Sequence, residues 1–288
     1  MDAVTRIEHA LAAAVSYADA AGCPPGLAAA MRHAVFPRGA RIRPRICLAV
    51  ASACREDDPV ITDAAAAAIE LLHCASLVHD DLPCFDDADT RRGKPSVHRL
   101  FGERLAVLSG DALIVLAFQT LALAARAPQR LGALLVTVSG SVGVPAGIVA
   151  GQAWECEPRA ELAHYHRQKT GALFAAATVA GAAAAGAEPE AWRVLGERIG
   201  EAYQVADDIR DAVADADELG KPTGQDLAHG RPSAIIELGV EGAVQRLEQL
   251  VAEAMAAIPQ CAGAAELRAL IRLEARRLLP KKLARRAA

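Results

Sequence analysis

Aromatic residues are scarce in this chain of 288 residues: they make up 3% of the sequence, although hydrophobic residues make up 53%. A core of this composition must be built mainly from Ala, Leu, Val and Ile. Because Ala has the strongest helix propensity of all residues, long Ala- and Leu-rich stretches favour a helical fold. The length allows one large domain or two small ones.

An excess of charge is also missing, since the formal net charge is −4 and the isoelectric point is about 6.1. This balance gives no reason to expect a nucleic-acid-binding surface. The seven cysteines are scattered and form no CxxC pair. A zinc site and a disulfide framework are therefore not expected, and a reducing, cytoplasmic location fits best.

Uninterrupted hydrophobic segments are few. The N-terminal segment, which includes Asp2 and Arg6, predicts an amphipathic helix rather than a signal peptide. Residues 131–154 contain no charge and reach the length of a membrane span. Because Gly and Pro residues interrupt them, we interpret them as a pair of buried central helices broken near Gly143–Pro145. Residues 171–187 predict a further buried helix, so no membrane span is expected.

Helical periodicity recurs along the chain, and alternating segments of β-branched residues are scarce. Clusters of Gly and Pro separate helices of roughly ten to twenty-five residues. These clusters lie at residues 22–25, 37–39, 56–59, 92–95, 127–128, 186–189, 220–224 and 230–232. No linker is long or polar enough to mark a domain boundary. We therefore expect one all-α domain over residues 1–288, a bundle of about ten or more helices.

Two aspartate clusters interrupt this apolar background. The first, HDDLPCFDDAD at residues 79–89, follows an apolar helical stretch. The second, DDIRD at residues 207–211, lies inside a helix predicted from about Trp192 to Val213. Asp207 and Asp211 are four residues apart, so both carboxylates project from one face of that helix. A single cluster of this kind is usually a solvated face, but the apolar neighbours here favour carboxylates that face a cavity.

Hard oxygen ligands in two separated clusters suit Mg²⁺, which prefers carboxylates together with substrate phosphates. Neither cluster has the spacing of an EF-hand. Basic segments supply cations for a phosphate group: Arg91 and Arg92 follow the first cluster, and Arg43 lies in the segment RGARIRP at residues 38–44. One basic loop alone more often serves solubility. A magnesium–diphosphate site explains both signs of charge together.

These motifs resemble the trans-isoprenyl diphosphate synthases over about residues 30–240. DDxxxxD matches Asp80–Asp86, followed by the family's Arg-Arg-Gly at residues 91–93, and DDxxD matches Asp207–Asp211. Further matches are His73, Lys169-Thr170, Gln204 and Gly220-Lys221. The segments GARIRP, HCASLVHDDLP and GQAWE are most similar to bacterial geranylgeranyl diphosphate synthases of carotenoid and chlorophyll pathways.

The resemblance implies the isoprenoid synthase fold with a central cavity, and a homodimer. It implies that three Mg²⁺ ions on the allylic diphosphate are held by Asp80, Asp81, Asp86, Asp207, Asp208 and Asp211. The residues implied to contact the allylic substrate (dimethylallyl, geranyl or farnesyl diphosphate) are Arg91, Lys169, Thr170, Gln204 and Lys221. Those implied to bind isopentenyl diphosphate are Arg43, His73 and Arg92.

Two positions depart from the family pattern. Ala40 stands where the family has a lysine that contacts a diphosphate, and either Arg38 or Arg41 would have to compensate. Arg231 stands where the family has a lysine in a later Gly-Lys-x-Thr segment, so the charge is kept with a different geometry. These changes either weaken the binding of isopentenyl diphosphate or are simply common in this subfamily.

The resemblance implies ionisation of the allylic diphosphate, attack by the double bond of isopentenyl diphosphate, and proton loss in a closed apolar cavity. Product length should depend on the depth of that cavity. Ala75 lies five residues before Asp80, about 7.5 Å along a helix, and Ser76 one residue nearer. Farnesyl-forming relatives place a bulky aromatic at Ala75, so its methyl group favours a C20 product over C15. Alternatively, Ala75 packs against a neighbouring helix and a deeper residue forms the floor.

Other functions remain open at this point. A class I terpene cyclase shares an aspartate motif, but usually pairs it with an Asn/Ser/Glu triad. A head-to-head synthase of the squalene type carries a different acidic pattern. A farnesyl diphosphate synthase, or a non-catalytic subunit of a prenyl diphosphate synthase, fits the motifs as well; Ala40 favours the subunit, and the two aspartate motifs favour an enzyme.

Overall fold

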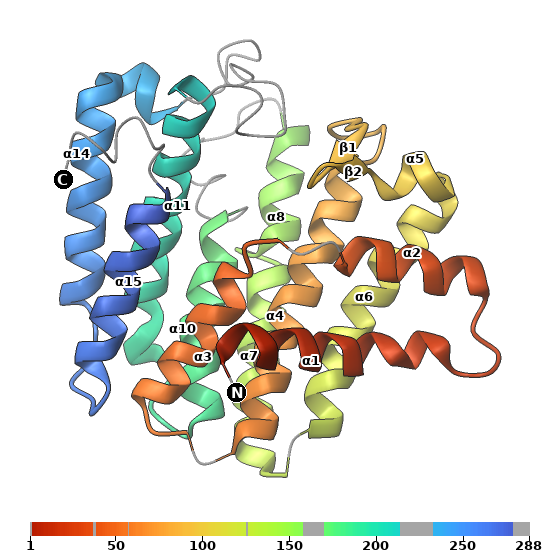
Figure 1. The fold of residues 1–288 in the computed structure, drawn as a ribbon, viewed down its shortest axis with the longest axis horizontal. Coiled ribbons are helices and arrows are strands. Elements are labelled where there is room, and N and C mark those ends of the chain that lie inside the picture. The colour runs from red at the N-terminus through yellow and green to blue at the C-terminus, as the bar shows by residue number, and fades with distance from the viewer. Residues whose placement is uncertain are drawn as a thin grey trace. The chain divides into compact units, whose positions relative to one another are not determined.

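The computed structural model describes residues 2–36, 39–56, 58–124, 126–157, 170–213 and 233–278. Helices make up almost all regular structure in these ranges (Figure 1), so the predicted all-α fold is confirmed. The exception is a short hairpin of two antiparallel strands, β1 Thr90–Arg91 and β2 Lys94–Pro95. It replaces the loop expected at residues 92–95.

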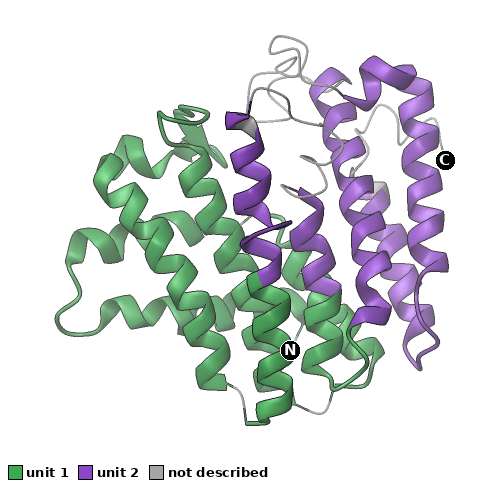
Figure 2. Ribbon diagram, turned by 180° about the vertical axis from the view of Figure 1, so that it is seen from behind, with its two compact units in different colours: residues 1–139, 179–189 green, residues 140–178, 190–288 purple. Residues whose placement is uncertain are grey.

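Two compact units share the chain (Figure 2). Unit 1 comprises residues 1–139 and 179–189, and unit 2 comprises residues 140–178 and 190–288. The chain passes from one unit to the other near residue 139 and again near residue 178. Both of these points lie inside helices and not in a linker. The single domain over residues 1–288 stays a prediction.

The Gly and Pro clusters found in the sequence separate most of the helices of unit 1. These helices are α1 Ala3–Val15, η1 Ser16–Asp19, α2 Pro25–Val35, α3 Ile42–Ala53, α4 Pro59–Asp80, α5 Val97–Phe101, α6 Glu103–Ala124 and most of α7 Pro128–Val142. The carboxylates of Asp2 and Asp58 accept hydrogen bonds from the first free N–H groups of α1 and α4. Pro59 occupies the first position of α4, where its missing N–H costs no helical hydrogen bond.

Helix α4 forms the core of unit 1 and packs on α6, α3, α1 and α2. Its five consecutive alanines, Ala64–Ala68, are all buried. The packing is also close at the other end of α4, where a Cβ added to Gly110 of α6 would lie 2.1 Å from Nε2 of His79. The close packing fixes the end of α4, which is where the first aspartate motif begins.

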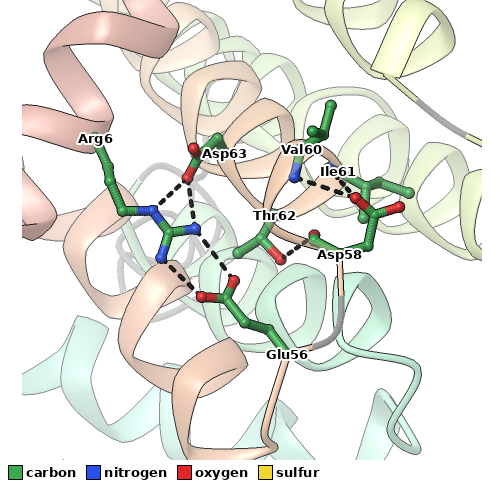
Figure 3. A network of polar contacts seen from close by, with 7 residues as sticks. All are labelled: Arg6, Glu56, Asp58, Val60, Ile61, Thr62 and Asp63. Atoms are coloured by element: carbon green, nitrogen blue, oxygen red, sulfur yellow. Dashed lines mark hydrogen bonds and ion pairs between the residues drawn. The ribbon is translucent and has the colours of Figure 1, made fainter. Parts of the chain in front are cut away.

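The N-terminal helix α1 is attached to the start of α4 by an ion-pair network (Figure 3). Arg6 donates from Nη1 to Oε1 of Glu56 at 2.7 Å and from Nε to Oδ1 of Asp63 at 2.8 Å. Burial raises the pKa of Asp63. For Glu56, burial also acts to raise the pKa, but the hydrogen bonds from Arg6 and Thr62 outweigh it and lower the pKa.

The uncharged residues 131–154 are broken as predicted, since α7 ends at Val142 and α8 spans Ile148–Ala153. The expectation of two buried helices was wrong, since Val149 of α8 is 53% exposed and α7 is also covered on one side only. Helix α7 buries one stripe that includes Leu134 and Val138, whereas Val136 is 74% exposed. The glycines and hydroxyls of the segment argue against a membrane span, and its lack of charge suggested burial. An uncharged composition does not show, however, how many faces of a helix other elements cover.

Two described helices, α4 and α6, are long and apolar enough to cross a membrane. In the most apolar part of α4, 72% of the residues are buried inside the chain, compared with 39% in α6. Core helices of soluble proteins meet the same criteria, so these two helices are weak evidence for a membrane span.

The elements of unit 2 are α8, η2 Trp154–Cys156, most of α10 Ala172–Ala184, η4 Glu190–Trp192, α11 Arg193–Val213, α14 Ala234–Ala256 and α15 Ala264–Leu278. Helix α11 matches the helix predicted around the second aspartate motif. Two of its glycines bring it close to the chain around α10: a Cβ at Gly196 would lie 2.5 Å from Cα of Ala175, and one at Gly200 2.9 Å from Cα of Gly171. The buried helix expected at residues 171–187 is confirmed by α10.

Candidate active site

The first aspartate motif begins in the last turn of α4 and continues into a tight loop. The N–H of Asp86 donates to the carbonyl of Asp80 at 3.0 Å, and the N–H of Ala88 donates to the carbonyl of Asp81 at 3.2 Å. Leu82 anchors this loop in a small apolar cluster with Val78 of α4 and Val97 of α5. The backbone thus folds back on itself and brings the three aspartates of DDxxxxD into one short segment.

Asp81 and Arg91 form an ion pair at the centre of this segment. Nε of Arg91 donates to Oδ1 of Asp81 at 2.9 Å, and Nη2 of Arg91 donates to the same oxygen. Burial raises the pKa of Asp81, against the opposing effect of Arg91. A predicted metal ligand and a predicted diphosphate ligand therefore touch each other, and with Arg92 they line one pocket.

Two further aspartates of the cluster bind α5 instead. Nε of Arg99 lies 2.6 Å from Oδ1 of Asp89, and Nη2 of Arg99 donates to Oδ1 of Asp87 at 3.2 Å. His98 approaches Asp87 as well, with Nε2 3.6 Å from Oδ1. We expected no role for these four residues. Their contacts tie the motif loop to α5, and the acidic pair followed by a basic pair ten residues later was the available signal.

The residues predicted to bind isopentenyl diphosphate are grouped around the start of α3 and the middle of α4. Nη1 of Arg43 lies 3.3 Å from Nε2 of His73. Arg92 reaches the same loop from the hairpin, because a Cβ on Gly39 would lie 2.7 Å from the carbon of its guanidinium group. Burial lowers the pKa of His73 well below its usual range, and the charge of Arg43 lowers it further. His73 is therefore neutral.

Arg41 does not replace the lysine that is missing at Ala40. Its side chain is buried and donates to Oε1 of Glu70 at 2.6 Å, to Oε1 of Glu8 at 3.0 Å and to the carbonyl of Val35 at 2.8 Å. A guanidinium group engaged in this way is part of the protein interior. The other candidate, Arg38, lies outside the described residues.

The second aspartate motif belongs to a chain of hydrogen bonds within unit 2. Thr170 donates from Oγ1 to Oε1 of Gln204 at 3.1 Å, and Gln204 donates from Nε2 to Oδ1 of Asp208 at 2.9 Å. The other oxygen of Asp208 accepts from the N–H of Ala234 at the start of α14, at 2.8 Å. Three residues that the resemblance assigned to the allylic substrate site thus contact one another in series.

The outer carboxylates of this motif differ in exposure. Asp211 is buried, whereas the side chain of Asp207 is 38% exposed and accepts a hydrogen bond from Nη2 of Arg210 at 3.0 Å. Arg210 also lies over the ring of Tyr203. The expectation that apolar neighbours surround the motif holds for Asp208 and Asp211 only. Lys169, Lys221 and Arg231 lie outside the described residues, so their roles stay predictions.

The donor chemistry of the motifs fits magnesium. Among the described residues, no group of three or more His, Cys, Asp or Glu side chains is arranged as a complete metal site. Mg²⁺ seldom uses an all-protein cage; it is usually bound through one or two carboxylates, with water and substrate phosphates as the other ligands. Both motifs offer carboxylate oxygens, and both lie beside hydrogen-bonded substrate residues. This set suits a metal ion that binds together with a diphosphate.

The two chain-length candidates face different directions from α4. Ser76 shares a face with His73 and Asp80, because the three are spaced by three and four residues. Ala75 lies one turn before His79, whose ring contacts the carbonyl of Val107 on α6. Ala75 is 1% exposed and lies on the side of α4 that packs on α6. This position agrees with the alternative that Ala75 packs against a neighbouring helix, so its role in product length stays a prediction.

Comparisons with known proteins agree on one family. A family model described as polyprenyl synthetase matches residues 24–268. A geranylgeranyl diphosphate synthase of Cereibacter sphaeroides is 55% identical over 98% of both chains, and one of Rhodobacter capsulatus is 52% identical over 95% of both chains.

Solved structures agree with these sequence relatives. A geranylgeranyl pyrophosphate synthetase from Pyrococcus horikoshii has a TM-score of 0.80 at 27% identity and covers 94% of both chains. A geranyltransferase from Helicobacter pylori, complexed with magnesium and isoprenyl diphosphate, has a TM-score of 0.78 at 28% identity and covers 95% of this chain and 97% of its own.

Proposed function

Because the chain belongs to the polyprenyl synthetase family, we propose that it is a chain-elongating prenyltransferase that condenses isopentenyl diphosphate with allylic diphosphates to form geranylgeranyl diphosphate. The observation that carries this proposal is the 55% identity, over 98% of both chains, to a geranylgeranyl diphosphate synthase. Prenyl chain elongation agrees with the side chains of the site, which bind anions and metal rather than activate a nucleophile.

Each part of the proposed site has a task in this reaction. Arg43 and Arg92 bind the diphosphate of isopentenyl diphosphate, and neutral His73 accepts or donates a hydrogen bond there without adding charge. Arg91 stabilises the negative charge that develops on the departing allylic diphosphate. Thr170 and Gln204 orient that substrate through the contacts that run to Asp208. The alanine-rich core excludes water, which would otherwise capture the allylic cation.

The carboxylates of both aspartate motifs would hold magnesium together with the allylic diphosphate. The residues are Asp80, Asp81, Asp86, Asp207, Asp208 and Asp211. Bound magnesium supplies Lewis-acid stabilisation of the leaving diphosphate. A family neighbour complexed with magnesium and isoprenyl diphosphate supports this cofactor, and a count of three ions is part of the proposal.

A homodimer is part of the proposal, and α6 carries the surface that supports it. Leu108, Val115 and Leu123 are 52%, 65% and 61% exposed and recur at intervals of seven or eight residues, so they lie on one face. Exposed apolar stripes of this kind mark protein–protein contacts. A second copy of the chain is the occupant we propose. A cytoplasmic location and a place before carotenoid formation remain predictions.

Product analysis tests the proposed activity. The purified chain is incubated with isopentenyl diphosphate, Mg²⁺ and, in separate reactions, dimethylallyl, geranyl or farnesyl diphosphate. We expect a C20 diphosphate as the main product and no product after chelation of magnesium. A main C15 product identifies a farnesyl diphosphate synthase, a cyclic hydrocarbon identifies a cyclase, and no prenyl product with any primer contradicts an enzyme and favours a non-catalytic subunit.

A further inference from the structure

Glu70 is an ionisable residue for which the proposed reaction has no direct use. It lies in the middle of α4, is 1% exposed and has only apolar residues beside it in the sequence. A buried carboxylate is costly unless cations and hydrogen-bond donors surround it. The surroundings of Glu70 therefore show what the residue does.

The nearest cation is Arg41, at the point where the chain enters α3. Arg41 has φ +50° and ψ +36°, a left-handed conformation that non-glycine residues rarely adopt. Its guanidinium group donates to Glu70, Glu8 and the carbonyl of Val35. These three contacts hold the unusual backbone in place. Arg43 follows two residues later, so its position depends on the same anchor.

The second cation is Arg92, in the hairpin between β1 and β2. Nη2 of Arg92 lies 3.7 Å from Oε1 of Glu70, the same oxygen that Arg41 contacts at 2.6 Å. Arg92 also has a left-handed backbone, with φ +54°. Its guanidinium group lies against Gly39, where a larger residue would collide with it. One carboxylate oxygen thus joins two loops that are about fifty residues apart in the sequence.

Glu70 contacts its two cations at different distances. Its Oε1 accepts a hydrogen bond from Arg41 at 2.6 Å and lies 3.7 Å from Nη2 of Arg92. The shorter contact fixes the loop before α3, and the longer one orients the guanidinium group of Arg92. His73, one turn after Glu70 on α4, contacts Arg43 and completes the group.

We propose that Glu70 is a positioning residue: through Arg41 and Arg92 it holds the loop at residues 39–43 and the hairpin at residues 90–95 so that Arg43, His73 and Arg92 converge on the diphosphate of isopentenyl diphosphate. This inference rests on the proposed function. It also explains how the chain keeps a defined anion site with Ala40 in place of the family's lysine, because the remaining cations are fixed from behind.

The test is the variant Glu70→Gln, which keeps the shape of the side chain and removes its charge. We expect KM for isopentenyl diphosphate to rise about tenfold or more, the usual effect of losing a hydrogen bond to a charged group. KM for farnesyl diphosphate should change less than about twofold, because Arg91 and the residues of unit 2 keep their contacts.

Two controls separate positioning from folding. Asp63→Asn removes a partly buried carboxylate from the same helix, two turns earlier, and should leave both KM values unchanged. The double variant Arg41→Met with Glu70→Gln removes both members of this buried pair, and Glu8 loses its hydrogen bond from Arg41. KM for isopentenyl diphosphate should stay raised in the double variant, since Arg92 still lacks its carboxylate.

Three results would overturn the inference: an unchanged KM for isopentenyl diphosphate in Glu70→Gln, equal rises in both KM values, or a normal KM in the double variant. Calorimetric titration with isopentenyl diphosphate alone needs no turnover. If the unaltered chain makes no prenyl product yet binds isopentenyl diphosphate more tightly than Glu70→Gln does, the proposed function fails and the positioning role stands. Equal affinities of the two proteins overturn the positioning role.

Discussion

At the scale of single residues, the site depends on side chains whose orientation is fixed by hydrogen bonds and ion pairs. Asp81 is paired with Arg91, Gln204 bridges Thr170 and Asp208, and neutral His73 lies beside Arg43. Each of these contacts orients a polar group before any substrate arrives. Preorganisation of this kind lowers the cost of reorganisation during the reaction.

The resemblance to prenyl diphosphate synthases links product length to Ala75. Ala75→Tyr places a ring on the face of α4 that packs on α6, which should block the growing chain and change the main product from C20 to C15. Overpacking should also cost about 1–3 kcal/mol of stability. Chromatography of the products with a dimethylallyl primer measures the change.

The matched control is Ala67→Leu, a change at another fully buried alanine of α4. It lies on the face of Leu71 and Cys74 and should lower stability while C20 remains the main product. An Ala75→Tyr variant that still forms mainly C20 would contradict the depth argument and favour a deeper floor.

At the scale of helices, the contact between α4 and α6 is set by Gly110 and His79. In Gly110→Ala the new Cβ meets the ring of His79, and we expect a loss of about 1–3 kcal/mol in the free energy of unfolding. In a His79→Ala background the same change should be neutral or stabilise by up to about 1 kcal/mol, because Ala is the better helix former. Urea denaturation of the four proteins in this cycle measures the reversal. Equal losses in both backgrounds would show that His79 is not the obstacle.

The network between α1 and α4 has a pH dependence of known sign. The pKa of Glu56 is lowered from its ordinary 4.5, so its contribution is complete above that pH and is lost as the pH falls through the lower folded value. Asp63, whose pKa is raised, acts in the opposite direction. Glu56→Gln should therefore be less stable by about 1 kcal/mol at pH 7, and the difference should shrink below pH 4.5. Melting temperatures from pH 7 to 3 test this; a constant difference would contradict it.

Individual elements show how much of the structure could be predicted from the sequence alone. Helices α4 and α11 and the break between α7 and α8 could be predicted, because periodicity and Gly/Pro punctuation are local signals. The hairpin of β1 and β2 could not, since two-residue strands carry no periodicity. The partners of Glu70 were equally hidden: its contacts with Arg41 and Arg92 depend on tertiary packing, and a single Glu in an apolar helix gives no indication of which distant cations surround it.

At the scale of the whole molecule, the proposed homodimer depends on the exposed face of α6. Val115→Glu should convert a dimer into a monomer, because a charge would be buried without a partner in the contact. Light scattering coupled to size-exclusion chromatography measures the mass. Leu273→Glu on α15, at a position that is 48% exposed, is the control and should leave the dimer intact. A monomeric unaltered chain, or a dimer that tolerates both changes, would contradict the assignment of this face.

The position of the first aspartate motif at the end of α4 has a further consequence. The carbonyl groups that end a helix give it a negative pole, so Asp80 and Asp81 add negative charge where the helix dipole already disfavours it. A bound cation relieves both effects, and ligands that bind only the folded state stabilise it. We therefore expect Mg²⁺ to raise the melting temperature of the chain. Asp80→Asn should raise it without metal and reduce the further gain from Mg²⁺. Asp80 and Asp81, which we propose bind the metal, would then also be the residues that destabilise this end of the helix.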